Sequence, residues 1–182
     1  MCATAVNAKS AGPFEAVLAE IRSEAATTRR VLDRIPEDKL DWRPHPKSMS
    51  LGQLGMHIAI VPGAVSKLLS EPEGNLNPDN FKNNPQPKNK AEILSTFDEG
   101  TKASEMFIGQ LTPAGAAEAW TLKANGAPIF AQPRATVIRS ILMNQIYHHR
   151  GQLSVYLRLL EVPVPSIYGP SADENPFAPK PA

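Results

Sequence analysis

The distribution of proline is the feature of this sequence that most restricts its fold. Eighteen of the 182 residues are proline, and a proline inside a helix costs about 3 kcal/mol. Long helices are therefore confined to the stretches that lack it. Three such stretches are long, at residues 14–35, 88–112 and 134–162, and a shorter one covers residues 47–61. The sequence thus has room for four helices.

A proline share of about a tenth is twice the usual ~5% and raises the question of disorder. The rest of the composition is that of a globular chain, because 42% of the residues are hydrophobic, 20% are charged and the net charge is only +1. A chain of this length can bury about 70% of the surface that its unfolded form exposes. We expect one domain over residues 1–182, with a core at about 14–162 and a tail at 163–182.

Apolar periodicity predicts a helix in each proline-free stretch. In the last stretch one apolar stripe is formed by Ile138, Leu142, Ile146, Leu153, Leu157 and Leu160. The second helix also has a start signal, since Ser50 and Gln53 form the pattern of a capping box. Pro62 falls within the apolar run of this helix and should kink it one turn after His57.

One further regular element is predicted between the helices. Apolar and polar residues loosely alternate on both sides of Asn125-Gly126, a pair that favours a type I′ hairpin turn. The segment 71–90, rich in proline, asparagine and lysine, is predicted to be a long loop. The predicted fold class is all-α: a four-helix bundle with a small β-hairpin between the third and fourth helices and an extended C-terminal tail.

Composition also excludes several classes of protein. The single cysteine, Cys2, permits neither an intramolecular disulfide nor a thiolate metal cluster, and the first residues lack the pattern of a secretory signal. The longest apolar run, at residues 56–65, is too short to span a membrane. A net charge of +1 provides no basic surface for nucleic acid. We therefore expect a cytoplasmic protein that binds neither membranes nor nucleic acid.

Histidines are the residues best suited to carry chemistry. His57 lies on the apolar second helix, either as a hydrogen-bonded core residue or as a metal ligand. His148 and His149 are adjacent on the fourth helix and point about 100° apart, so at most one of them joins a shared site. Gln145 lies one turn before His149, and burying such a polar strip without partners would cost about 1 to 3 kcal/mol per group. Protein hydrogen bonds, waters or a metal shared with His57 would satisfy it.

Other polar residues have simpler interpretations. Arg150 is expected to be solvated or paired. Tyr168, Asp173 and Glu174 could fold back over the mouth of the bundle, although a proline-rich tail is more often simply packed or mobile. The fourth helix has no carboxylate between residues 134 and 160, which excludes hydrolysis of the HExxH type.

Two segments of the chain, taken together, resemble a known family. They are KSMSLGQLGMHIA at residues 47–59 and NQIYHHRGQLSVYLRLLEVPVPSIYGPSADE at residues 144–174. From about residue 14 to residue 174 the chain is similar to the DinB/YfiT-like superfamily, which includes a DNA-damage-inducible product and thiol-dependent metal transferases. The resemblance implies a four-helix bundle, a homodimer, and a divalent ion such as nickel or zinc. Three histidines would hold the ion, one on the second helix and an H-x-x-x-H pair on the fourth.

Carried over residue by residue, the resemblance places metal ligands at His57, Gln145 and His149. Gln145 is a departure, because the family has a histidine there and an amide oxygen is a weaker ligand for a borderline-soft ion. His148 could substitute for it only if the fourth helix rotates or distorts.

The resemblance therefore implies a DinB-like metal-dependent enzyme, a thiol-dependent transferase or a hydrolase. Its substrate would be a small molecule, with thiols as one class, and the ion would activate a bound water or thiolate. The alternative is a non-catalytic dimeric module, metal-free or weakly metal-binding, that binds a small molecule or serves in a stress response. No catalytic residue is assigned by these patterns.

Overall fold

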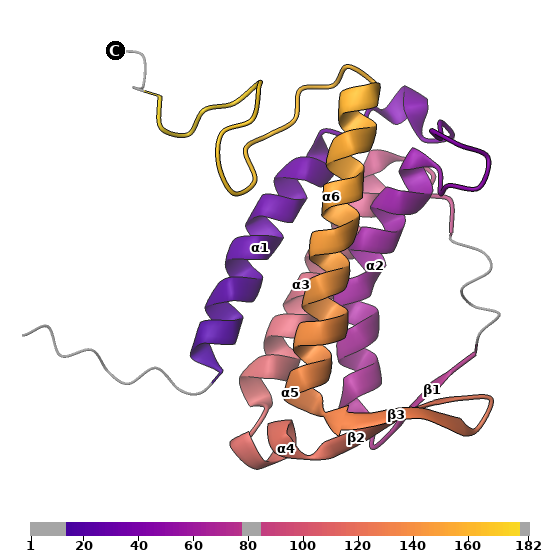
Figure 1. Ribbon diagram of the computed structural model, residues 1–182, viewed down its shortest axis with the longest axis vertical. Coiled ribbons are helices and arrows are strands. Elements are labelled where there is room, and N and C mark those ends of the chain that lie inside the picture. The colour runs from indigo at the N-terminus through magenta and orange to yellow at the C-terminus, as the bar shows by residue number, and fades with distance from the viewer. Residues whose placement is uncertain (1–13, 78–84, 179–182) are drawn as a thin grey trace, which may run out of the picture.

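Four long helices run side by side in the computed structural model, which describes residues 14–77 and 85–178 (Figure 1). They are α1 (Glu15–Asp33), α2 (Leu51–Ser70), α3 (Lys90–Gln110) and α6 (Asn144–Leu159). Helices α1 and α2 each pack against both α3 and α6. The pair of α1 and α3 therefore lies opposite the pair of α2 and α6. The predicted helical bundle is confirmed. Cys2 and the residues examined for a secretory signal lie outside the described ranges.

Short elements connect these helices or extend them. They are η1 (Glu37–Lys39) after α1, α4 (Pro113–Ala117) after α3, and α5 (Arg134–Val137) with a π-helical segment (Ile138–Met143) before α6. Within the described residues, no helix combines the length and the apolar character needed to cross a bilayer.

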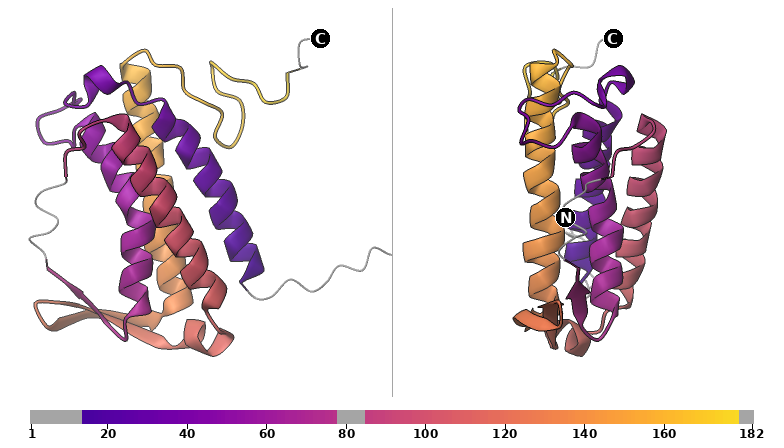
Figure 2. Two further views of the ribbon diagram at one scale, coloured as in Figure 1. Left: turned by 180° about the vertical axis from the view of Figure 1, so that it is seen from behind. Right: turned by 90° about the vertical axis from the view of Figure 1, so that its right-hand side faces the viewer.

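The helices are ordered up, down, down, up (Figures 1 and 2). One hydrophobic cluster joins the end of α1, the starts of α2 and α3 and the end of α6, and it includes Leu32, Leu54, Ile93 and Leu157. A second cluster joins the opposite ends and includes Ile21, Leu69, Ile108 and Leu142. Helices α2 and α3 are therefore parallel, and the long connection between them returns the chain from one end of the bundle to the other.

Helix α2 begins at the predicted capping box. The Ser50 hydroxyl accepts a hydrogen bond from the backbone N–H of Gln53 at 3.1 Å, and the Ser50 N–H donates to Gln53 Oε1 at 3.0 Å. Both bonds satisfy donors that a helix start leaves unpaired. The helix then continues through Pro62 as a single element to Ser70.

Glycines bring α2 and α3 into close contact. A Cβ added to Gly100 would lie 3.0 Å from the backbone nitrogen of Gly63 and 3.3 Å from the carbonyl oxygen of Ala59. Glycine inside a helix costs about 1 kcal/mol relative to alanine. At Gly100 this cost is offset by backbone packing that no larger residue permits.

The hairpin predicted around Asn125-Gly126 is confirmed. Strands β2 (Ala119–Ala124) and β3 (Ala127–Pro133) are antiparallel. Asn125 and Gly126 have φ angles of 49° and 79°, and a type I′ turn requires positive φ at both positions.

The predicted loop at 71–90 is wrong in one part, because β1 (Gly74–Leu76) pairs in parallel with β2. The pairing is positioned by Trp120, whose indole N–H donates to the Glu71 carbonyl at 3.1 Å. A Cβ on Gly74 would lie only 2.4 Å from the Trp120 ring. A strand of three residues is too short to show an alternating pattern in sequence.

The last predicted helix is correct in position but not in detail. It starts as α5, passes through one π-helical segment and ends at Leu159, three residues before the predicted end. The end is a Schellman motif: Glu161 has φ 58°, and the N–H groups of Glu161 and Val162 donate to Arg158 and Leu157. The left-handed position after a helix usually holds glycine, which marks the helix end in a sequence. Here the position holds Glu161, so the sequence does not show where the helix ends.

The C-terminal tail lies against the bundle rather than apart from it. Val164 is buried, and its N–H donates to Asp173, which pairs with Arg158 at the end of α6. Glu174 pairs with Arg30 of α1. Asp173 and Glu174 thus bind the tail to the ends of α6 and α1, respectively.

We predict that Gly100→Ala lowers the free energy of unfolding by about 1 to 3 kcal/mol, because the new methyl group cannot fit against α2. Gly109 of the same helix is the matched control, since its nearest neighbour would be Leu18 Cδ1 at 4.0 Å. Gly109→Ala should stabilise the fold by up to about 1 kcal/mol. Urea unfolding of both variants measures the difference, and equal effects would contradict close packing of α2 on α3.

Candidate metal centre

Two histidines from different helices meet where α2 packs on α6. The rings of His57 and His149 have centroids 4.4 Å apart and an interplanar angle of 81°. Both residues are half-buried. The sequence prediction that His57 and His149 share one site is consistent with this geometry, which brings together residues 92 positions apart.

Amide side chains flank His149 at both ring nitrogens. Nε2 lies 2.8 Å from Gln145 Oε1, one turn earlier, and Nδ1 lies 2.7 Å from Gln152 Oε1, one turn later. A neutral imidazole carries one N–H donor and one acceptor. The neutral His149 ring can therefore donate to only one of the two amide oxygens. Its other nitrogen, which carries a lone pair, then faces the second oxygen without a hydrogen between them.

Burial lowers the pKa of His149 below its usual value of 6.5. The hydrogen bond with Gln152 opposes this effect, while the neighbouring His57 and His148 add to it. Desolvation disfavours the charged imidazolium. His149 is therefore neutral near pH 7, which is the protonation state that binds metal ions.

His148 lies beside this pair but is exposed, with its ring 4.7 Å from that of His149. Among the described residues, no group of three or more His, Cys, Asp or Glu side chains is arranged to hold an ion. The candidate donors are two imidazoles, whose rings are in contact, and the Gln145 amide oxygen, which contacts His149. Three protein ligands with an open position match the pattern of catalytic zinc sites, and the neutral amide makes this set a weak version of it.

A buried ion pair determines which way His149 faces. Arg150 is 1% exposed, and its guanidinium contacts Glu24 at 2.7 Å and the Thr28 hydroxyl at 3.0 Å, both on α1. It also donates to the Tyr168 hydroxyl at 2.5 Å. Adjacent helical residues point about 100° apart. With Arg150 held against α1, His149 is turned towards α2.

The π-helical segment ends at Met143, two residues before Gln145. Single π-helical turns are rare and frequently occur at functional sites. Neither the π-helical segment nor the burial of Arg150 was anticipated from sequence. The solvated alternative for Arg150 is excluded, and no local pattern in the sequence marks either feature.

The tail residues do not join the histidines. Tyr168 contacts Arg150 and Glu24 on the α1 side of the bundle. His45 lies in the loop before α2, where its Nδ1 accepts a hydrogen bond from the Lys47 N–H at 3.1 Å. The candidate centre is therefore formed by α2 and α6 alone.

Comparison with known proteins gives a family and a fold. The DinB family model matches residues 1–178, and no curated protein matches the sequence. A DinB-like protein from Bacillus cereus is similar in structure, with a TM-score of 0.66 and 20% identity over 85% of this chain and 97% of that one. A DinB-like protein from Bacillus subtilis has a TM-score of 0.61 and 18% identity over 80% and 92% of the two chains. At these identities the structures establish the fold alone.

We predict that Arg150→Met costs about 3 to 5 kcal/mol of stability, because it leaves Glu24, whose side chain is only 14% exposed, without its cation. The matched control is Arg139→Met, which breaks the ion pair with Glu20 on the surface. An exposed pair contributes about 0 to 1 kcal/mol. Urea unfolding compares the variants, and a similar loss in both would show that Arg150 does not anchor α6.

The lowered pKa of His149 predicts how stability varies with pH. The unfolded chain takes up a proton near pH 6.5, before the folded protein does. The free energy of unfolding is therefore unaffected by His149 protonation above about pH 6.5, and it declines as the pH falls below that value. Imidazole NMR titration should give a pKa below 6.5 that decreases further in Gln152→Ala. A pKa above 6.5 would contradict the burial of this ring.

Proposed function

We propose that this chain, which belongs to the DinB family, binds a divalent ion, nickel or zinc, and acts as a metal-dependent enzyme on a small molecule. His57 and His149 would supply imidazole ligands and Gln145 an amide oxygen. The observation that carries the proposal is the position of the His149 ring, held between two amides and facing His57.

The two hydrogen-bonding nitrogens of His149 have different roles in this proposal. Metal-binding histidines usually donate their second N–H to an acceptor that fixes the ring, and Gln152 Oε1 accepts from Nδ1 in that role. The Nε2 lone pair then faces Gln145 Oε1 at 2.8 Å. Two acceptors this close repel one another, and a cation near both would relieve the repulsion.

The chemistry follows from the open positions that three protein ligands leave. A divalent ion bound there would act as a Lewis acid towards a water or a thiol. This chain contributes neutral ligands and no carboxylate from α6. His148 is exposed beside His149. The family resemblance favours a thiol-bearing small molecule as the substrate. It also favours a homodimer.

One observation favours the second candidate, a non-catalytic, metal-free module with a role in small-molecule binding or stress. If one of the two amides turns to present its NH₂ group, His149 makes a complete pair of hydrogen bonds without any ion. The polar strip on α6 would then be a structural feature of the interface between α2 and α6. The two candidates differ in metal content.

We predict that protein purified without a histidine tag binds one zinc or nickel ion per chain in calorimetric titration. His57→Ala and His149→Ala should abolish binding, whereas His45→Ala, a histidine outside the centre, should not alter it. Gln152→Ala keeps every donor but removes the support of the ring, and it should weaken binding about 10- to 100-fold.

Gln145→His is the complementary test, because it supplies a third imidazole one turn before His149. Binding should become tighter in this variant. Weak binding of less than one ion per chain that neither histidine substitution alters would contradict the enzyme proposal and leave the metal-free module.

A further inference from the structure

The C-terminal tail reaches the ion pair that fixes α6. Its residues 163–175, here called the strap, leave the end of α6 and lie beside α1 (Figures 1 and 2). The Tyr168 hydroxyl accepts a hydrogen bond from Arg150 and donates one to Glu24 at 3.1 Å, and Arg150 Cζ lies 5.0 Å from the centre of the Tyr168 ring. Arg150 is 1% exposed, whereas Tyr168 is 73% exposed. Tyr168 is therefore the outermost member of this polar cluster.

The strap is closed by its own hydrogen bonds. The Ser171 hydroxyl donates to the Val164 carbonyl at 2.6 Å and accepts from the N–H groups of Asp173 and Glu174 at 3.1 and 3.0 Å. Compact surface loops that are held by their own side chains are frequently functional. Because these bonds lie within the strap, it keeps its shape and moves as one unit.

The contacts that attach the strap to the bundle are mostly exposed. Asp173 pairs with Arg158 of α6, and Glu174 pairs with Arg30 of α1. Both arginine side chains are 49% exposed, and exposed ion pairs contribute little to stability. The buried residues of the strap are confined to its start, at residues 164–166. Segments with few buried contacts open at a lower free energy than a core, so the strap opens before the bundle unfolds.

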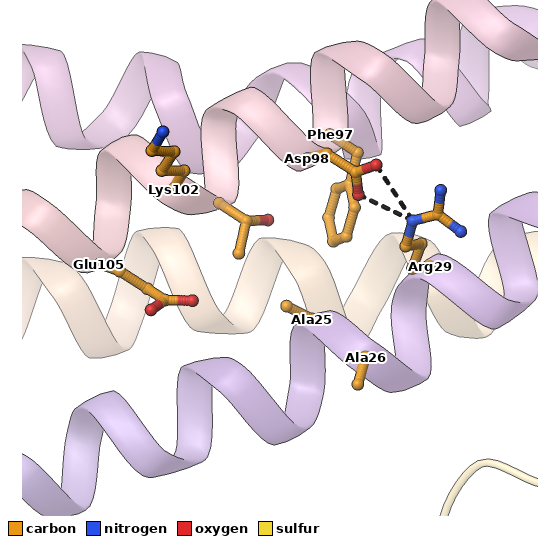
Figure 3. A pocket seen from close by; sticks show the side chains of 8 residues that line it. Ala25, Ala26, Arg29, Phe97, Asp98, Lys102 and Glu105 are labelled. Atoms are coloured by element: carbon orange, nitrogen blue, oxygen red, sulfur yellow. Dashed lines mark hydrogen bonds and ion pairs between the residues drawn. The ribbon is translucent and has the colours of Figure 1, made fainter.

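Helix α1, which lies beneath the strap, is also fixed from its other side. Arg29 pairs with Asp98 of α3 at 2.8 Å, beside the groove between the two helices (Figure 3). Arg22 pairs with Glu105 of α3 at 2.8 Å. The neighbouring Arg30 binds the tail instead. Helix α1 therefore stays on α3 when the strap opens, and only the contacts with the tail are lost.

Opening the strap changes the surroundings of Arg150. The guanidinium loses the Tyr168 hydroxyl, and water gains access to its ion pair with Glu24. An ion pair weakens as its surroundings become more polar. Since Arg150 opposes rotation of α6, the adjacent His149 is then directed less firmly towards His57.

We propose that the strap controls the candidate metal centre from the other side of α6. When it is closed, Tyr168 completes the partners of Arg150 and holds His149 in its binding orientation; when it is open, that orientation is loosened. Tyr168 is thus a positioning residue that touches neither histidine. Control of ion binding rests on the proposed function, whereas opening of the strap and its effect on the His149 ring do not.

Hydrogen exchange of the full chain, followed by NMR, measures the opening. The N–H groups of Val164 and Ser166 donate to Asp173 and Glu174. They should exchange faster than the N–H of Leu153, which is buried in α6. The double substitution Asp173→Asn with Glu174→Gln should speed their exchange about five- to tenfold and leave Leu153 unchanged.

The matched control is Glu20→Gln, which breaks another exposed ion pair between α1 and α6. The exposed fractions of Glu20 and Arg139, 34% and 51%, are close to those of the Glu174–Arg30 pair. This variant should leave the exchange of the strap unchanged. Strap N–H groups that exchange as slowly as Leu153, in the parent chain and in the double variant alike, would overturn the proposal.

A second pair of variants tests the connection to the histidine. Tyr168→Phe keeps the ring and removes the hydroxyl that bonds to Arg150, and it should shift the imidazole NMR signals of His149. Tyr147→Phe removes a hydroxyl that bonds to Glu20 instead, and it should leave those signals in place. His149 signals that neither Tyr168→Phe nor the double variant alters would overturn the proposal.

Titration with zinc ions separates this proposal from the proposed function. If the parent chain binds zinc, Tyr168→Phe and the double variant should bind it about two- to tenfold more weakly, and equal affinities would overturn control of ion binding. A parent chain that binds no zinc would contradict the proposed function, and with it the control of ion binding. Hydrogen exchange and the His149 signals would still decide whether the strap positions the ring.

Discussion

The buried guanidinium of Arg150 fixes the positions of α6, α1 and the C-terminal tail relative to one another. It bonds to Glu24 and Thr28 on α1 and to Tyr168 in the tail, and a charge this deeply buried is stable only with such partners. Helix α6 cannot rotate without breaking these bonds. Because His149 precedes Arg150, the same constraint directs the histidine towards α2, where it meets His57. The candidate metal centre thus depends on an ion pair on the other side of α6.

Each contact between helices has its own chemistry. Helices α2 and α3 approach closely through Gly63 and Gly100, which leaves no room for a ligand there. Helices α2 and α6 meet through the rings of His57 and His149 beside a shared apolar cluster, whereas α1 and α3 are bridged by surface ion pairs. The proposed metal centre therefore lies where the helices meet through side chains rather than through close backbone contact.

Local features of the sequence predicted most of the fold. Proline spacing located the four helices, Asn125-Gly126 located the hairpin, and the four-residue spacing of Gln145 and His149 placed both on one face of a helix. The missed features depend on distant residues or on geometry without a sequence signal. Arg150 finds its partners on α1 more than 120 positions away, β1 pairs with a strand 48 residues on (Gly74 with Leu122), and the π-helical segment has no marker in sequence.

The central claim is that the rotation of α6 set by Arg150 places His57, Gln145 and His149 around one ion. Anomalous scattering from a crystal grown with zinc or nickel tests it directly, because it locates the ion among these side chains. We expect a single strong peak between α2 and α6, within bonding distance of a nitrogen of each histidine. A peak elsewhere on the molecule, or none at the histidines while Gln145 and Gln152 both remain hydrogen-bonded to His149, would contradict it.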